Sequence, residues 1–317
     1  MLKFSTWGGA ALLSAALLVL PGCGEDQAAS AAAAGAAAAA ADGASSELRI
    51  GVCPGPYGLM VEKAIAPALE QEGYRVTVVD FTDYVQPNLA LESGDLDANL
   101  MQHRAYLDNL VATQGAQIEA VTNVPTLGMG VFSDKVKDLS PESLEAIRGG
   151  QVGVPNDAVN LARSLRLAQE LGLVLLSALK DENQASIADI EQNPLGLEFV
   201  PMEAAQIARS LDSLALGFVP GNYAYAAQLD YAQALGVEQV AEDIKNVIAV
   251  PQGDEAMKAL FLRVVQAPAF KQAIESDSGF DAFTRPQWWN EVAAASAGAS
   301  AAESSAASSA AAAPEAQ

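Results

Sequence analysis

The 317-residue sequence has a single histidine, His103, and only two cysteines, Cys23 and Cys53. One histidine cannot build a histidine-rich zinc site, and a Ser-His-Asp triad would have to use His103. The sequence also lacks a G-x-S-x-G segment, a P-loop and a dinucleotide-binding G-x-G-x-x-G context. We therefore expect no enzyme, no cofactor and no metal site. Cys53 has no C-x-x-C partner, and we expect it to be a small buried apolar residue.

Basic residues are scarce as well. The chain has 17 lysines and arginines against 39 aspartates and glutamates, a formal net charge of −22. Such a charge repels phosphate backbones, which argues against a nucleic-acid partner. After the N-terminal region no apolar run reaches the roughly 18 residues that a membrane helix needs. We therefore expect the body of the chain not to span a membrane.

The N-terminus has the pattern of an export signal. Lys3 precedes an apolar run from Ala10 to Leu20, and Leu20–Cys23 resembles a lipobox. We expect a signal peptide at 1–22 and diacylation of Cys23, which would anchor the protein in the cell envelope, facing the periplasm or the exterior. The alternative is an ordinary cleaved signal or a cysteine that stands at this position by chance. The Ala-rich segment 23–47 is expected to be a tether, and the Ala/Ser-rich segment 291–317 a disordered tail.

Between these segments, short apolar runs rich in β-branched residues alternate with stretches of helical spacing. This alternation is typical of an α/β fold with mostly parallel sheets. Ligands of such sheets bind beyond the carboxyl ends of the strands, beside helix N-termini. The predicted strands are 48–52, 74–81, 97–100, 120–122, 128–132, 152–154, 198–201, 214–219 and 247–250.

One candidate site follows the predicted strand 152–154. Asn156 or Asp157 can cap the next helix, which places Asn160 and Arg163 on one face of its opening turns. A positive helix end, an amide and a guanidinium together suit a carboxylate ligand. The alternative is an exposed Arg163 that pairs with a surface acid.

A second cluster combines aromatic and soft apolar side chains. Tyr84 follows a predicted strand, and Met101, His103 and Tyr106 are close in sequence, the last two on one face of a predicted helix. Such side chains suit a thioether or a similar apolar group. The spacing of His103, Tyr106 and the two leucines after them equally fits a stripe of core residues.

Together these segments resemble the NlpA family of lipoproteins, the methionine-binding subunits of methionine ABC importers. The resemblance covers residues 48–280 and includes the lipobox position. The matching segments are Phe81–Asn88, Gly94–Asn99, Gln102-His103 with Tyr106-Leu107, Val154–Asp157 with Asn160 and Arg163, and Arg209–Asp212, with weaker support from Asn222–Ala224 and Asn246.

The resemblance implies a two-lobed periplasmic-binding-protein fold, type II-like, with a ligand cleft between the lobes. The first lobe is expected at 48–127 and 221–290, and the second at 128–220. By analogy Arg163 would bind the ligand carboxylate, with help from Asn160 and Asn246. The side-chain pocket would be lined by Tyr84, Met101, His103 and Tyr106.

The implied function is the capture of methionine, with L-methionine expected, and its delivery to a membrane permease driven by a separate ATPase. Two positions depart from the family pattern. Met101 replaces a usual Phe, and Pro220 replaces a frequent ligand-contacting Asn, for which Asn222 is the candidate substitute. The alternative is a surface lipoprotein of the same fold that binds another amino acid or a small peptide for sensing or adhesion.

Overall fold

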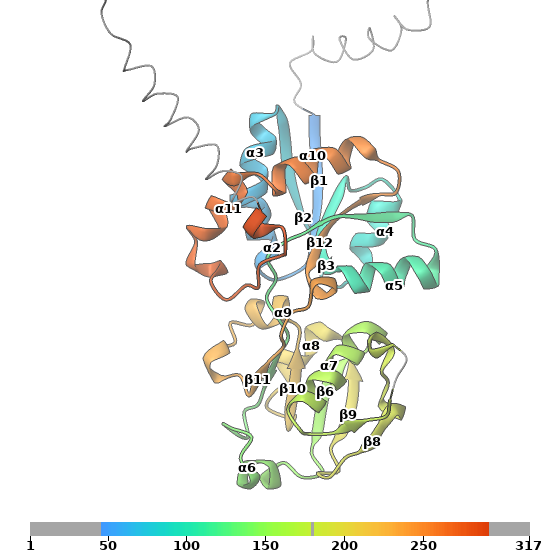
Figure 1. The fold of residues 1–317 in the computed structure, drawn as a ribbon, viewed down its shortest axis with the longest axis vertical. Coiled ribbons are helices and arrows are strands. Elements are labelled where there is room, and N and C mark those ends of the chain that lie inside the picture. Colours follow the sequence, from blue (N-terminus) through green and yellow to red (C-terminus); the bar gives the residue numbers. More distant parts are fainter. Residues whose placement is uncertain (1–45, 179–180, 292–317) are drawn as a thin grey trace, which may run out of the picture. The chain divides into compact units, whose positions relative to one another are not determined.

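The computed structural model describes residues 46–178 and 181–291, which form two five-stranded sheets flanked by helices (Figure 1). Cys23, the predicted signal and nearly all of the predicted tether and tail lie outside this part of the chain. Strand β1 begins at Ser46, so the last two residues of the predicted tether already belong to a sheet. Among the described helices, none is both long enough and apolar enough to cross a membrane.

The first sheet has the strand order β2-β1-β3-β12-β4, and we call it with its helices the first lobe. Its strands are β1 (Ser46–Val52), β2 (Tyr74–Asp80), β3 (Ala98–His103), β4 (Ile118–Asn123) and β12 (Asn246–Pro251). Its helices are α2 (Pro56–Met60), a π-helical turn η1 (Val61–Ile65), α3 (Ala66–Gln71), α4 (Gln86–Glu92), α5 (Arg104–Gln114), α10 (Glu255–Val265), α11 (Pro268–Glu275) and the 3₁₀ turn η7 (Ser278–Phe280).

The second sheet has the order β11-β5-β10-β6-β9, and we call it with its helices the second lobe. Its strands are β5 (Gly130–Phe132), β6 (Gln151–Pro155), β9 (Glu198–Met202), β10 (Leu216–Val219) and β11 (Gly236–Val237), and a separate pair is formed by β7 (Leu175–Leu176) and β8 (Ile190–Gln192). The helices are α6 (Pro141–Ala146), α7 (Ala158–Glu170), α8 (Ala204–Ile207) and α9 (Gly221–Ala226), with 3₁₀ turns η2 (Glu182–Gln184), η3 (Ile187–Asp189), η4 (Ala208–Ser210) and η5 (Tyr231–Gln233). A last 3₁₀ turn, η6 (Glu242–Ile244), lies in the segment that returns to the first sheet.

In each sheet one strand runs against the other four. Strand β12 is antiparallel to β3 and β4, and β5 is antiparallel to β10 and β11. These are the strands that the chain forms directly after it passes from one sheet to the other. Each therefore begins at the end of the sheet where the four oppositely directed strands finish, so the start of β12 lies beside the end of β3 and the start of β5 beside the end of β10.

Two crossover segments, residues 124–129 and 238–245, connect the sheets and are hydrogen-bonded to each other and to the start of β12. The amide of Val124 donates to the Asn246 carbonyl (2.7 Å), and the Asn246 amide donates to Thr126 Oγ1 (2.8 Å). At the other end the Glu238 amide donates to the Met129 carbonyl (2.9 Å). The crossovers thus fix the place where the lobes meet.

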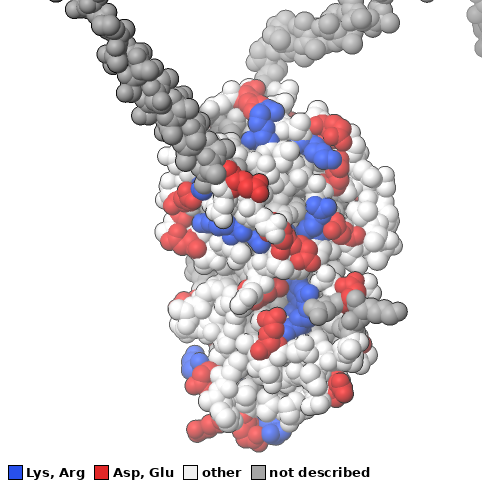
Figure 2. All heavy atoms as spheres, in the orientation of Figure 1, with Lys and Arg blue, Asp and Glu red and all other residues white. Residues whose placement is uncertain are grey.

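Each lobe has its own apolar core. Ile50, Leu100 and Phe261 are buried in the first lobe, and Val152 and Phe218 in the second. The acid excess remains at the surface. Figure 2 shows acidic and basic side chains interspersed on the face in view.

The predicted strands are present, with shifted ends. Strand β3 runs on to His103, whereas the sequence analysis ended it at residue 100 and began a helix there. The sequence analysis returned the chain to the first lobe at residue 221, but β11 pairs with β5 and is part of the second sheet. A two-residue Gly-Val strand carries no periodicity that would reveal it.

Substitution of Gly221 by Ala should destabilise the fold by about 1–3 kcal/mol, the usual cost of overpacking. A Cβ at this first residue of α9 would lie 2.2 Å from the Leu127 carbonyl oxygen of the first crossover. Urea unfolding measures the change. The matched control is Gly58→Ala within α2, where the nearest atom to an added Cβ is 3.5 Å away. That variant should gain up to about 1 kcal/mol from helix propensity, and equal effects in both variants would contradict the packing argument.

Candidate functional site

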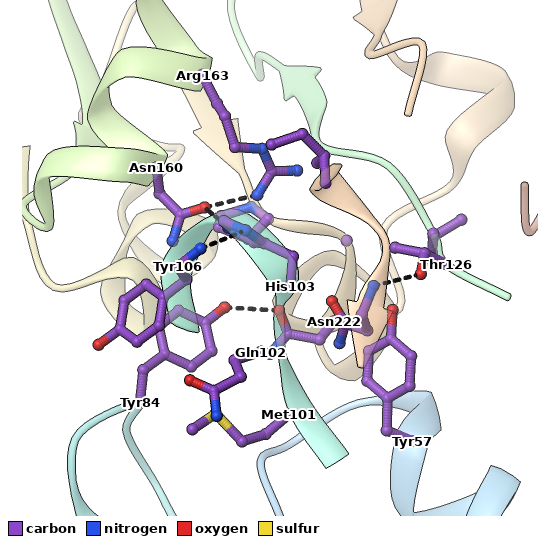
Figure 3. A pocket seen from close by; sticks show the side chains of 15 residues that line it. Tyr57, Tyr84, Met101, Gln102, His103, Tyr106, Thr126, Asn160, Arg163 and Asn222 are labelled. Carbon is purple, nitrogen blue, oxygen red and sulfur yellow. Dashed lines mark hydrogen bonds between the residues drawn. The ribbon is translucent and has the colours of Figure 1, made fainter. Parts of the chain in front are cut away.

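A cavity lies where the strand ends of both lobes meet (Figure 3). Its enclosed space is about 20 Å³, enough for about one water molecule, so a larger ligand can enter only when the lining side chains or the lobes move apart. The cavity brings together all eight candidate site residues named from the sequence. The lining residues are Tyr57, Tyr84, Met101, Gln102, His103, Tyr106, Thr126, Leu127, Asn160, Arg163, Pro220, Gly221, Asn222, Ile244 and Asn246.

His103 ends β3 and caps α5. Its backbone is extended, and its Nδ1 accepts a hydrogen bond from the Tyr106 amide at 3.0 Å. The prediction that His103 and Tyr106 share one face of a helix is therefore wrong, because only Tyr106 is helical. The capping bond brings the two rings together instead, with centroids 6.1 Å apart.

Asp157 is the residue that caps α7. Its carboxylate accepts the Asn160 amide N–H and the Asn160 side-chain NH₂, both at 2.9 Å. Asn156, the other candidate cap, donates to Glu203 instead. The cap orients Asn160 so that its side-chain oxygen is directed into the cavity, beside Arg163 one turn further along the helix (Figure 3).

One amide oxygen joins the two lobes. His103 Nε2 lies 3.1 Å from Asn160 Oδ1, and Arg163 Nη1 donates to the same oxygen at 2.6 Å. Because His103 Nδ1 accepts from the Tyr106 amide, the ring proton resides on Nε2 and is donated to Asn160. This bond connects the last residue of β3, in the first lobe, to the opening turn of α7, in the second.

Arg163 is buried and paired with an acid that the sequence analysis did not identify. Glu238 accepts from Arg163 Nε at 2.9 Å and from Nη2 at 2.5 Å, and the two side chains are only 5% and 10% exposed. The alternative of an exposed Arg163 that pairs with a surface acid is therefore wrong. Arg163 does pair with an acid, but both side chains are buried. The Glu238 carboxylate also accepts the Met129 amide at 3.2 Å.

Aromatic and apolar side chains form another wall. The rings of Tyr84 and Tyr106 meet edge to face with centroids 6.0 Å apart, and Met101 is 3% exposed beside them. The Tyr84 hydroxyl donates to Asn222 Oδ1 at 2.7 Å, and Asn222 Nδ2 donates to the Pro54 carbonyl at 3.0 Å. Asn222 therefore links the second lobe to the first with both ends of its amide.

Some polar groups of the cavity are free to hydrogen-bond to a ligand. No described residue hydrogen-bonds to the Asn246 side-chain amide or to the Tyr106 hydroxyl. Arg163 has five N–H groups, and its bonds to Glu238 and Asn160 use three of them. The cavity can thus offer a ligand two guanidinium N–H groups, an amide and a hydroxyl.

Burial sets the charge of these groups. Burial, with a contribution from the positive Arg163, lowers the pKa of His103 to about 3, so the ring is neutral at pH 7. Burial acts to raise the pKa of Glu238, but the charge and hydrogen bonds of Arg163 outweigh it and hold that pKa below its usual range. Arg163 and Glu238 are accordingly both charged, and the cavity lining contains no carboxylate.

The sequence analysis did not name as site residues Tyr57 of α2, Gln102 of β3 and Gly221 of α9, nor the residues that come from the crossovers. Thr126, Leu127 and Ile244 line the cavity from the crossover segments, and Glu238 lies behind Arg163. A local pattern could not reveal them, because their position depends on how the chain passes between the sheets.

A wider groove opens beside the cavity and shares Tyr84 and Tyr106 with it. Asp83, Asp157 and Glu203 lie along this groove. The two tyrosines therefore stand between the enclosed cavity and a larger, acidic opening.

Comparisons with known proteins agree on one family. The NlpA lipoprotein family model matches residues 48–288. The D-methionine-binding lipoprotein MetQ of Escherichia coli K12 is 32% identical over 285 residues, 88% of this chain and 94% of the relative. A protein of Vibrio cholerae named as a probable D-methionine-binding lipoprotein MetQ is 34% identical over 277 residues, 81% of this chain and 95% of the relative.

Solved structures agree with these relatives. A nutrient-binding protein from Burkholderia cenocepacia bound to methionine is 33% identical and superposes with a TM-score of 0.69, over 75% of this chain and 99% of that chain. The methionine-binding protein MetQ is 32% identical, with a TM-score of 0.68 over 75% of this chain and 97% of that chain.

The neutral His103 should make stability depend on pH. The folded-state pKa of about 3 lies below the value of about 6.5 in an unfolded chain, so between these values only the unfolded chain takes up the proton. Stability therefore falls as the pH falls from 6.5, by up to about 1.4 kcal/mol per pH unit from this residue. Asn can keep the helix cap. Urea unfolding from pH 7 to pH 4.5 should thus show a shallower loss in His103→Asn, and parallel curves would contradict the assignment.

Proposed function

Because the chain belongs to the NlpA lipoprotein family, we propose that it is the substrate-binding lipoprotein of an ABC importer and binds methionine in the cavity between its lobes. The observation that carries this proposal is the joint position of a buried guanidinium and a thioether-compatible wall in one cavity, formed by residues of both lobes. The relatives named for methionine binding support the same ligand.

The polar end of the ligand would lie between Arg163 of the second lobe and Asn246 of the first. The carboxylate would accept from the guanidinium N–H groups of Arg163 that Glu238 and Asn160 leave free. The side-chain oxygen of Asn246, at the start of β12, would accept from the ligand ammonium group. Asn160 would act through Arg163, because its oxygen already accepts two hydrogen bonds.

The apolar end would lie against the first lobe. Met101, Tyr84 and Tyr106 present polarisable and aromatic surface, which suits a thioether sulfur. His103 would contribute as a neutral ring and thus adds no charge beside an apolar side chain. The Asn222 side-chain oxygen is already bonded to the Tyr84 hydroxyl. Asn222 would therefore contribute by positioning Tyr84, and it would not take over the ligand contact that the family's Asn makes at the position of Pro220.

Binding would favour the closed arrangement of the lobes. Ligand contacts to Arg163 and to Tyr84 lie on different lobes, so they stabilise the state in which His103 also reaches Asn160. The groove beside Tyr84 and Tyr106 would be the access route. Diacylation of Cys23 would hold the protein at the membrane, and a permease with its ATPase would accept the ligand.

Calorimetry of residues 46–291, unfolded and refolded to remove carried ligand, tests the proposal. Methionine should bind with a Kd of about 1 µM or tighter, at about −8 kcal/mol. Both enantiomers belong in the panel, since the sequence led us to expect L-methionine whereas the relatives are named for D-methionine. If only another amino acid binds, the importer role stands but that amino acid is the ligand. If nothing in the panel binds, the proposal is overturned.

Arg163→Lys should weaken methionine binding about 10- to 100-fold, because lysine keeps the charge facing Glu238 but loses the planar array of N–H groups. Lysine is a better test than alanine, which would leave Glu238 buried without a counter-charge. Arg166→Lys on the same helix is the matched control and should leave the affinity unchanged, since Arg166 does not line the cavity. Equal affinity of the two variants would place the ligand elsewhere.

A further inference from the structure

Glu238 is a buried carboxylate next to the cavity, and Arg163 is the only lining residue to which its side chain hydrogen-bonds. Among the ion pairs of residues 46–178 and 181–291, only this one has both side chains at most 10% exposed. The pairing is bidentate, because both Nε and Nη2 of Arg163 donate to the Glu238 carboxylate. Such a pair in a water-poor environment interacts strongly and is held in one geometry.

The remaining lining residues carry no formal charge. His103 is neutral, and the other lining side chains are tyrosines, amides, a threonine and apolar residues. Asp157, a further carboxylate, lies outside the cavity lining: it lines the neighbouring groove and is hydrogen-bonded to Asn160. Arg163 and Glu238 therefore cancel, and the cavity has no net positive charge to offer an anion.

Glu238 is also held in place by hydrogen bonds to the first crossover. Its side chain accepts the Met129 amide of the first crossover at 3.2 Å, while its own amide donates to the Met129 carbonyl at 2.9 Å. If the carboxylate moved away from Arg163 when a ligand arrives, it would therefore also lose its hydrogen bond to the Met129 amide. A ligand carboxylate would have to share the guanidinium with Glu238.

We propose that Glu238 sets the charge class of the ligand: by neutralising Arg163 it makes the cavity favour net-neutral zwitterions over anions of the same shape. A zwitterion adds a carboxylate and an ammonium group, so the site stays balanced. An anion adds a second negative charge to one guanidinium, which is costly where solvent is excluded. Glu238 is in this respect a specificity-determining residue that acts through Arg163.

The proposal rests on methionine binding, and its test compares methionine with its 2-hydroxy analogue. The analogue replaces the ammonium group by a hydroxyl and is a simple anion with the same side chain. In the wild-type protein the analogue should bind at least about tenfold more weakly than methionine. In Glu238→Gln, Arg163 keeps its full charge for the ligand, and the ratio of the two dissociation constants should shift by about tenfold or more toward the anion.

Two further variants separate charge from shape. Glu238→Asp keeps the charge and should keep the wild-type ratio. Glu242→Gln lies on the same crossover, where Glu242 binds Asn123 and Lys245 rather than Arg163, and should also keep that ratio. Circular dichroism of each variant checks that it folds.

The outcomes are distinct. A ratio that shifts only in Glu238→Gln supports the proposal. Equal weakening of both ligands in that variant overturns it, because Glu238 would then only maintain the shape of the site. Wild-type protein that binds the analogue as tightly as methionine overturns it without any variant. Wild-type protein that binds neither ligand instead overturns the proposed function.

Discussion

A guanidinium group taken out of water must have a counter-charge, and this requirement organises the site. Arg163 is 5% exposed, and Glu238 supplies the counter-charge from the second crossover. The pair in turn ties α7 to the segment that carries the chain back to the first lobe. Because Asn160 accepts from both Arg163 and His103, the same network extends to the end of β3 in the other lobe.

The two crossings of the chain explain why the polar residues converge. A strand formed just after a crossing begins where the parallel strands end, so β12 brings Asn246 to the place where β3 brings His103. Helix caps then direct the side chains. Asp157 orients Asn160, and His103 itself caps α5. The outcome is a cavity with one buried ion pair, neutral polar groups and an aromatic wall, which suits reversible binding of a small zwitterion with an apolar side chain.

Much of this could be predicted from the sequence. The strand–helix alternation predicted the α/β class, and local patterns supplied six residues that line the cavity, Tyr84, Met101, His103, Tyr106, Asn160 and Arg163. The family resemblance added Asn222 and Asn246, which line it as well. The first six residues could be predicted locally, because a helix cap, a turn or the end of a strand depends on only a few neighbouring residues. The same local reasoning failed at His103, where the i, i+3 spacing to Tyr106 comes from a strand end and its helix cap rather than from two helical residues.

The sequence by itself determined the class of fold, the segments that carry polar and aromatic side chains, and the family pattern they form. Only the tertiary structure decided which acid neutralises Arg163, since Glu238 is one of 39 acidic residues and lies 75 positions away in the chain. It also decided that β11 belongs to the second sheet and that Asn222 bonds to Tyr84 and Pro54. These contacts depend on how the chain passes between two sheets, and a long-range path of this kind leaves no periodicity or spacing in the sequence.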